Sequence, residues 1–204
     1  MTGKAGEREI YIPFAAAAQI THLSEKRIRN WLDNGHVRLD ADDRRPDASK
    51  HRRFSRLDLV RLALVGRLTG LGFSAERASL LIEDQVHVHA LITKQERKGR
   101  RKIVLPSSDK VRQQGFDPHA YYAEIIAGTD EDEILDALRD QVMTIYFYEG
   151  NLAETDQESE FSVFTHDQHK DPPEWGTKPD TSVRIEVWRI LQTINERLEG
   201  MDLK

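Results

Sequence analysis

The sequence contains no cysteine, and this absence excludes several classes of protein at once. Disulfide bonds, thiolate zinc sites, cysteine nucleophiles and cysteine-based redox or metal sensing all require a thiol. Aromatic residues make up only 7% of the chain and hydrophobic residues 38%, so we expect small cores and much solvated surface. With 204 residues, the chain can form one large domain or two small ones, since domains cluster near ~100–150 residues.

Long hydrophobic runs are also missing. No apolar stretch approaches the ~20 residues that a transmembrane helix needs. Residues 1–9 are polar and lack the apolar core of a signal peptide, and we expect them to form a flexible N-terminus. The sequence therefore predicts a cytoplasmic protein with no membrane partner.

The overall net charge of −5 conceals two unlike halves. Residues 1–105 contain 21 Lys and Arg against 13 Asp and Glu, a net of +8, whereas residues 106–204 contain 9 against 22, a net of −13. Long-range electrostatics attract phosphate to the first half and repel it from the second. This asymmetry indicates a first half that binds a polyanion and an acidic second half with another role; a solvated acidic surface is the alternative.

Residues 10–82 show short helical patterns separated by turn signals. Pro13 suits the first turn of an Ala-rich helix that ends near Ile20. Ser24 is placed to cap a second helix over residues 25–34. The apolar face of that second helix is formed by Ile28, Trp31 and Leu32. A short helix, a tight turn and a capped helix form the helix–turn–helix pattern.

A hairpin is expected directly after this pattern. Residues 37–39 alternate like a short strand, a polar loop follows, and residues 51–54 are typical of the returning strand. A basic hairpin in this place is a wing. Ser55 then caps a long apolar helix, which is interrupted at residues 70–72 before Ser74 caps a shorter one.

The order of these elements resembles the winged-helix DNA-binding domain of the MerR family of bacterial transcription regulators. The matching residues are Ser24, Arg27, Ile28, Arg29 and Trp31, then residues 34–37, then Arg52, Phe54, Ser55, Asp58 and Leu59, and finally Leu68 with residues 71–74. The resemblance implies a recognition helix over residues 24–34 that lies in the major groove, and a 37–54 hairpin that contacts the neighbouring backbone. It also implies a dimer on an inverted repeat. It covers about a third of the chain.

The basic and polar residues of this domain are its candidate DNA contacts. Arg and Lys side chains near the N-terminus of a recognition helix can reach guanine edges or phosphates, and an Arg cluster on a wing suits phosphates. We predict contacts from Ser24, Lys26, Arg27, Arg29 and Asn30 on the helix, and from Arg38, Arg44, Arg45, Arg52 and Arg53 on the wing. The alternative for any one arginine is that it only solvates a surface. Trp31 shares the apolar face, so we expect it in the core.

Residues 83–106 predict a second basic β-hairpin. Two apolar runs, 86–92 and 102–105, flank a basic turn that contains Gly99. The basic residues at its tip are candidates for further backbone contacts: Lys94, Arg97, Lys98, Arg100 and Arg101. Such contacts position a protein on DNA without specifying sequence. A solvated loop is the alternative.

Closely spaced histidines are the only hint of a metal site. The candidate pairs are His87 with His89, and His166 with His169. A metal site needs several ligands that converge in space, and nothing in the spacing brings these pairs together. We interpret them as surface or hydrogen-bonded residues, and expect neither a metal nor a cofactor.

Residues 107–165 predict an acidic region with helices, which could bind an effector or a partner. One helix is expected after Asp117, over residues 118–127, and another after a cap at Thr129. The apolar residues of that second helix recur at helical spacing: Ile134, Leu135, Leu138 and Val142. Strands or buried helix ends are both compatible with residues 144–148 and 161–164.

The end of the chain combines a linker and a helix. Residues 166–180 are rich in proline and predict a linker, and Thr181 to Leu203 predicts an amphipathic helix within the segment 181–204. Its apolar stripe consists of Val183, Val187, Leu191, Ile194 and Leu198. The stripe can pack on its own domain or pair with a second copy, and we favour a dimerisation helix.

The sequence thus predicts a mainly α protein with small β hairpins, in which a MerR-like winged helix–turn–helix is followed by an acidic α(+β) region. We expect a sequence-specific regulator that binds a palindromic site in double-stranded DNA as a homodimer, with room for an organic or protein effector. One alternative is an architectural or recombination accessory factor of the excisionase type. Another is an interaction or ligand-sensing module with an apolar pocket lined by Tyr121, Tyr122, Tyr146 and Phe147. No catalytic motif is present, so an enzyme is not expected.

Overall fold

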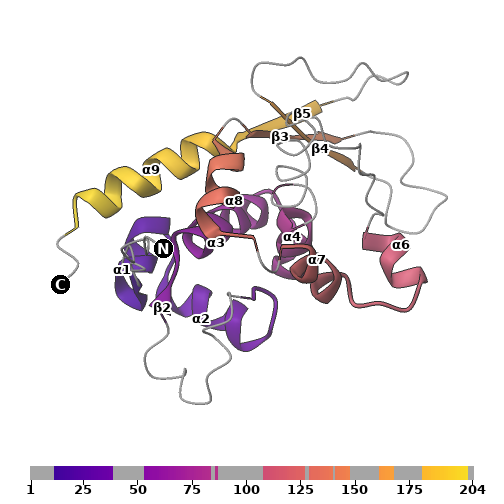
Figure 1. Ribbon diagram of the computed structural model, residues 1–204, viewed down its shortest axis with the longest axis horizontal. Helices are drawn as coiled ribbons and strands as arrows, with labels where there is room; N and C mark the ends of the chain where they lie inside the picture. The colour runs from indigo at the N-terminus through magenta and orange to yellow at the C-terminus, as the bar shows by residue number, and fades with distance from the viewer. Residues whose placement is uncertain are drawn as a thin grey trace, which may run out of the picture. The chain divides into compact units, whose positions relative to one another are not determined.

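The architecture was analysed in a computed structural model of the 204 residues. It describes residues 12–38, 53–83, 86, 108–126, 129–139, 141–147, 161–167 and 181–201. These residues are mainly helical and include two small antiparallel sheets (Figure 1). The chain divides into two compact units, Met1–Glu76 with Thr193–Lys204, and Arg77–Gln192. The predicted fold class, helices with small β elements, is confirmed.

The first unit begins with strand β1 (Ile12–Pro13) and helix α1 (Phe14–Thr21). The C-terminal cap of α1 is His22, whose backbone is left-handed with φ 56°. Helix α2 (Glu25–Asp33) follows after a short turn, and Asn34 is its C-terminal cap. The predicted helix–turn–helix is therefore present, with boundaries that differ from the prediction by about one residue.

Strand β2 (Arg53–Phe54) has a different partner from the one that the sequence suggested. It pairs antiparallel with β1, with Phe54 opposite Ile12. The prediction that it would return against residues 37–39 is wrong for the described part, because neither Val37 nor Arg38 lies in a strand. The Val37 amide instead donates to the Trp31 carbonyl at 3.3 Å, in the turn that ends α2. The loop at 39–52, with Arg44, Arg45 and Arg52, lies outside the described residues.

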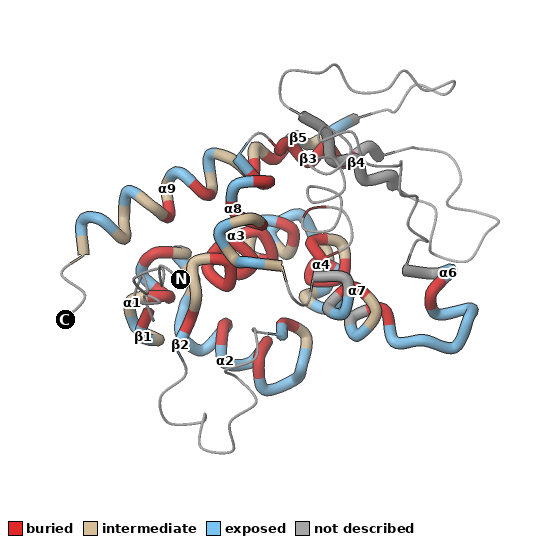
Figure 2. Tube along the Cα trace, viewed as in Figure 1, coloured by how far each residue is buried: buried red, intermediate tan, exposed pale blue. Residues whose placement is uncertain are grey.

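Helix α3 (Arg56–Gly70) forms the centre of the first unit and packs against α1 and β2. Its N-terminus carries a capping box in which the Ser55 hydroxyl accepts from the Asp58 amide at 3.2 Å and the Asp58 carboxylate accepts from the Ser55 amide at 3.1 Å. Its buried apolar residues are Leu57, Leu59, Val60, Leu62, Leu64, Val65 and Leu68, and Figure 2 shows the helix as mostly buried. Helix α4 (Ala75–Leu81) follows.

The second unit contains the helices α6 (Ser108–Gln113), α7 (Pro118–Ile126) and α8 (Glu131–Leu138). The predicted helix over residues 118–127 is confirmed to within one residue. The predicted cap of α8 is displaced by one residue, because the Asp130 carboxylate, not the side chain of Thr129, accepts from the Asp132 amide at 2.9 Å.

A three-stranded antiparallel sheet follows α8, with the order β4-β3-β5. Its strands are β3 (Gln141–Phe147), β4 (Phe161–Asp167) and β5 (Thr181–Glu186). Consecutive residues 141–145 of β3 are all buried. Because successive side chains of a strand point to opposite faces, both faces of β3 are covered. Where they are described, the two segments left open as strands or helix ends are strands, and Val142 lies in β3, not at the end of a helix.

The predicted helix from Thr181 to Leu203 is wrong over its first six residues, which form β5. Residues 181–186 alternate between β-branched and polar types, the period-2 pattern of a strand, and Val183 pairs with Ile145 of β3. The helix itself, α9 (Val187–Glu199), begins directly after β5.

The predicted hairpin over 83–106 falls mostly outside the described residues, as do its tip residues Lys94, Arg97, Lys98, Arg100 and Arg101. Val86 is described and has a π-helical backbone, so the predicted strand does not start at this residue. The N-terminus at 1–9 and residues 168–180 of the predicted linker also lie outside. The linker prediction is wrong at residues 166 and 167, which belong to β4. Among the helices that the structure describes, none combines the length and apolarity needed to cross a bilayer.

Candidate nucleic-acid interface

Helix α2 has one buried and one exposed face. Its start is fixed by Ser24, whose hydroxyl accepts from the Arg27 amide at 3.3 Å. The buried face consists of Ile28, Trp31 and Leu32, and the exposed residues include Lys26, Arg27, Arg29 and Asn30. Trp31 therefore lies in the core, as predicted. An amphipathic helix with a basic and polar outer face has the character of a helix that enters the major groove.

Arg27 is held at one side of this face. Its Nη2 donates to the Thr69 hydroxyl of α3 at 2.6 Å, and its guanidinium carbon lies 4.9 Å from the centre of the Trp31 ring. The Thr69 hydroxyl in turn donates to the Gly66 carbonyl at 3.1 Å. The Arg27 side chain thus has contacts on two helices while its residue remains exposed to solvent.

Arg29 lies at the opposite side of the face. Its guanidinium is 5.5 Å from the Phe14 ring at the start of α1, and this ring packs edge-on against Phe54 of β2, also at 5.5 Å. On a helix of 3.6 residues per turn, Lys26 and Asn30 fall between the positions of Arg27 and Arg29. Asp33, which is also exposed, falls between the two arginines as well. The exposed face therefore has Lys26, Asn30 and Asp33 at its centre and one arginine at each side, next to an aromatic ring.

The turn between α1 and α2 sets the position of this face. The Leu23 amide donates to the Ala18 carbonyl at 3.2 Å, and the Leu23 side chain lies against Gly66 of α3. A Cβ atom at Gly66 would lie 2.9 Å from Cδ2 of Leu23. The glycine therefore allows the turn to approach the backbone of α3 closely.

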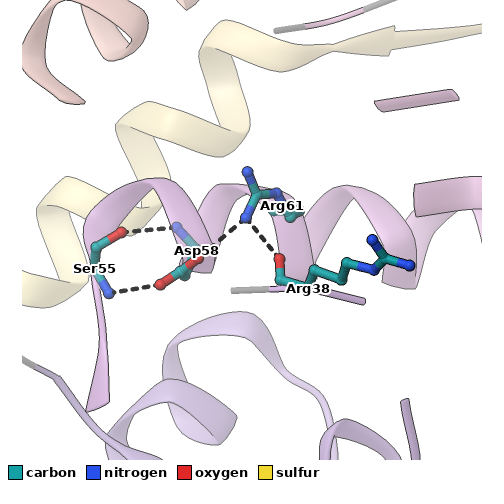
Figure 3. Close-up of polar contacts among 4 residues, drawn as sticks. All are labelled: Arg38, Ser55, Asp58 and Arg61. Carbon is teal, nitrogen blue, oxygen red and sulfur yellow. Dashed lines mark hydrogen bonds and ion pairs between the residues drawn. The ribbon is translucent and has the colours of Figure 1, made fainter. Parts of the chain in front are cut away.

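The chain that leaves α2 is attached to α3 by a buried arginine. Nη1 of Arg61 donates to the Arg38 carbonyl at 2.8 Å (Figure 3). The same nitrogen forms an ion pair with Oδ1 of Asp58 at 3.3 Å. Asp58 and Arg61 are only 3% and 4% exposed. The Arg61 side chain therefore links the backbone at Arg38 to α3, and Asp58 pairs with its charge in the buried environment.

The structure brings together most of the predicted contact residues that it describes. Lys26, Arg27, Arg29 and Asn30 share the exposed face of α2, and Ser24 is at its N-terminus. Arg38 and Arg53 are both exposed, Arg38 at the exit from α2 and Arg53 on β2.

Two residues that contact this region, Arg61 and Thr69, were not predicted from the sequence. Arg61 follows Asp58 at helical spacing, which signals an i,i+3 ion pair. Thr69 lies 42 residues from Arg27, and no local pattern connects them.

The proposed dimer residues of the C-terminal segment have mixed environments. Val187, Leu191 and Ile194 are buried within a single chain, and Leu198 is half-buried. Val183 lies in β5, not on the helix. Beside Leu198, the Arg197 guanidinium donates to the carbonyl of Ile20 at the end of α1. Contacts within a single chain therefore cover much of the apolar stripe that was predicted to form the dimer.

The acidic region contains no assembled site among the residues described. Tyr122 is fully buried, and its ring packs edge-on against Tyr121 at 5.5 Å. The side chains of Tyr146 and Phe147 lie outside the described part, so the predicted apolar pocket stays a prediction. Within the described ranges, no group of three or more His, Cys, Asp or Glu residues could hold a metal ion.

Part of the chain matches a known protein family. Residues 13–85 match the family described as MerR HTH family regulatory protein. No match was found among curated proteins. The matched segment runs from β1 past α4 and includes α1, α2, β2 and α3, so it contains the whole exposed face described above. The resemblance drawn from the sequence is confirmed: residues 13–85 are similar to the helix–turn–helix domain of MerR regulators, which supports a DNA-binding regulator.

Proposed function

We propose that the protein is a sequence-specific transcription regulator that binds a palindromic site in double-stranded DNA as a homodimer. The observation that carries this proposal is the exposed face of α2, where Lys26 and Asn30 lie between Arg27 and Arg29 in a segment similar to MerR DNA-binding domains. A helix with this face suits the width of the major groove.

The two kinds of residue on this face have different roles in the proposal. Lys26 and Asn30, at its centre, are placed for base edges: lysine pairs with guanine acceptors, and asparagine pairs with adenine. Arg27 and Arg29, at its two sides, are placed for the phosphates that line the groove. Further phosphate contacts come from the wing: Arg38, Arg44, Arg45, Arg52 and Arg53.

We infer the homodimer from the two-fold symmetry of a palindromic DNA site. A single helix–turn–helix recognises a half-site, and two copies related by a two-fold axis recognise a palindrome. The C-terminal helix α9 is our candidate for the contact between copies, through the half-buried Leu198 and its neighbours. Because Val187, Leu191 and Ile194 are already covered within one chain, a dimer that uses them needs a different arrangement of α9.

The proposal is tested by selecting fragments of bacterial genomic DNA with the purified protein at near-physiological salt. We expect enrichment of a short palindrome, which the Arg27→Ala/Arg29→Ala variant does not enrich. Arg139→Ala/Arg189→Ala is the matched control, because it removes two exposed arginines outside the matched segment and should leave the enrichment unchanged.

The other outcomes are equally informative. A cluster of adjacent sites with strong DNA bending would favour the architectural or recombination accessory role over promoter regulation. A folded, dimeric protein that enriches no fragment would contradict the proposal and direct the search to a partner of the acidic region.

A further inference from the structure

The Thr69 hydroxyl occupies a particular place at the C-terminal end of α3. It accepts a hydrogen bond from Nη2 of Arg27 at 2.6 Å and donates one to the Gly66 carbonyl at 3.1 Å. The second bond fixes the direction of the hydroxyl hydrogen, so that an oxygen lone pair faces the arginine. A threonine in this position therefore acts as an oriented acceptor.

Arg27 would otherwise be a mobile side chain. An exposed arginine samples many rotamers, and ordering it on binding costs conformational entropy. Here the Trp31 ring supports the guanidinium at 4.9 Å, and Thr69 holds one of its N–H groups. A planar guanidinium carries further N–H donors beyond the one that is used, so the fixed group can still donate to an anion.

We propose that Thr69 is a positioning residue for DNA binding, which holds the Arg27 guanidinium in the orientation that meets a DNA phosphate at the side of α2. This inference rests on the proposed function. Thr69 need not touch DNA itself; it lowers the entropic cost that Arg27 would incur on binding. A hydroxyl suits this role because it is neutral and leaves the charge of Arg27 available for the phosphate.

The test uses the full-length protein and the palindrome found in the selection, with affinities measured over a range of salt concentrations. Thr69→Val removes the hydroxyl at almost constant volume, and we expect affinity to fall about 3- to 10-fold. Arg27→Ala removes the contact itself, with a loss of about 10- to 100-fold. Thr69→Ser keeps the hydroxyl and should bind like the wild type.

Two further readouts separate positioning from a general effect on folding. Arg27→Ala should reduce the slope of log K against log salt by about 0.9, the value for one lost phosphate contact, whereas Thr69→Val should leave the slope unchanged. In the Arg27→Ala background, Thr69→Val should have no further effect, because the group that it positions is gone. Thr69→Ala provides a second variant without the hydroxyl, with good helix propensity, should the valine variant fold poorly.

The inference is overturned if Thr69→Val and Thr69→Ala bind DNA as tightly as the wild type while Arg27→Ala does not. It is equally overturned if the loss from Thr69→Val persists in the Arg27→Ala background, which would indicate a structural role. Failure of the proposed function looks different, because the wild type would then show no preference for any duplex sequence.

Discussion

Arg27 in the first unit and Arg189 in the second each place a guanidinium over a tryptophan of their own helix, at 4.9 Å and 5.2 Å from the ring centre. Their polar partners differ. Arg27 donates to the neutral hydroxyl of Thr69, whereas Nε of Arg189 lies 2.6 Å from a carboxylate oxygen of Glu186. A hydroxyl orients an arginine and leaves its charge unbalanced, while a carboxylate orients and balances it. In our proposal, the arginine that binds a phosphate is therefore the one that is held by a neutral partner.

The two units also differ in how they use ion pairs. The pair of Asp58 and Arg61 is buried and holds the Arg38 carbonyl. The pair of Asp136 and Arg139 in the second unit is exposed, with side chains 52% and 72% accessible and 3.6 Å between the charged atoms. The first pair links the backbone at Arg38 to α3, whereas the second lies in solvent, which screens it.

The largest effect is expected from breaking the buried pair. Asp58→Ala removes the carboxylate that pairs with Arg61 in the core and also removes the capping box, so the free energy of unfolding should fall by about 3–5 kcal/mol. Asp136→Ala, the exposed counterpart, should change it by only ~0–1 kcal/mol. Urea denaturation of both variants measures the difference. Equal losses in the two variants would show that burial does not distinguish the pairs.

A smaller effect is expected from giving Arg27 the kind of partner that Arg189 has. Thr69→Glu places a carboxylate beside the guanidinium, which balances its charge and adds repulsion toward phosphate, so DNA affinity should fall about 10- to 100-fold. Thr69→Gln is the uncharged control of similar size and should lose less. Binding titrations at two salt concentrations measure both variants. A glutamate variant that binds no worse than the glutamine variant would contradict the role of the neutral partner.

The smallest effects concern helix caps, which should be alike in the two units. Ser24 caps α2 and Asp130 caps α8, each through one side-chain oxygen that accepts from a backbone amide at 3.3 Å and 2.9 Å. Ser24→Ala and Asp130→Ala should each lower the free energy of unfolding by about 1 kcal/mol. Thermal or urea denaturation provides the measurement, with Ser24→Asp as a variant that retains a cap. A loss well above this value at Ser24 alone would indicate a further structural role for its side chain.

The helices of the first unit could be predicted because their signals are local. Ser24 and Ser55 stand directly before apolar residues at helical spacing, and their hydroxyls do cap α2 and α3. The polar face of α2 follows from the same periodicity, which is why its exposed residues could be named from the sequence.

The errors arise where distant segments decide the structure. Phe54 pairs with Ile12, far away in the sequence, and no local feature favours that partner over residues 37–39. Val183 and Val187 are spaced as on a helix, but residues 181–186 also alternate as on a strand, and pairing with β3 decides in favour of the strand. The contact of Arg27 with Thr69 is of the same long-range kind. The sequence therefore predicts which residues face outward and leaves open what holds them in place.

The central claim is that the exposed face of α2 binds duplex DNA through positioned arginines. The most direct test is the affinity for the selected palindrome as a function of salt, in the wild type, in Arg27→Ala/Arg29→Ala and in Arg139→Ala/Arg189→Ala. We predict that the first variant loses about 100-fold or more in affinity and nearly two units of salt slope, about 0.9 for each phosphate contact. The second should match the wild type. Equal losses in the two variants, or none in either, would contradict the claim.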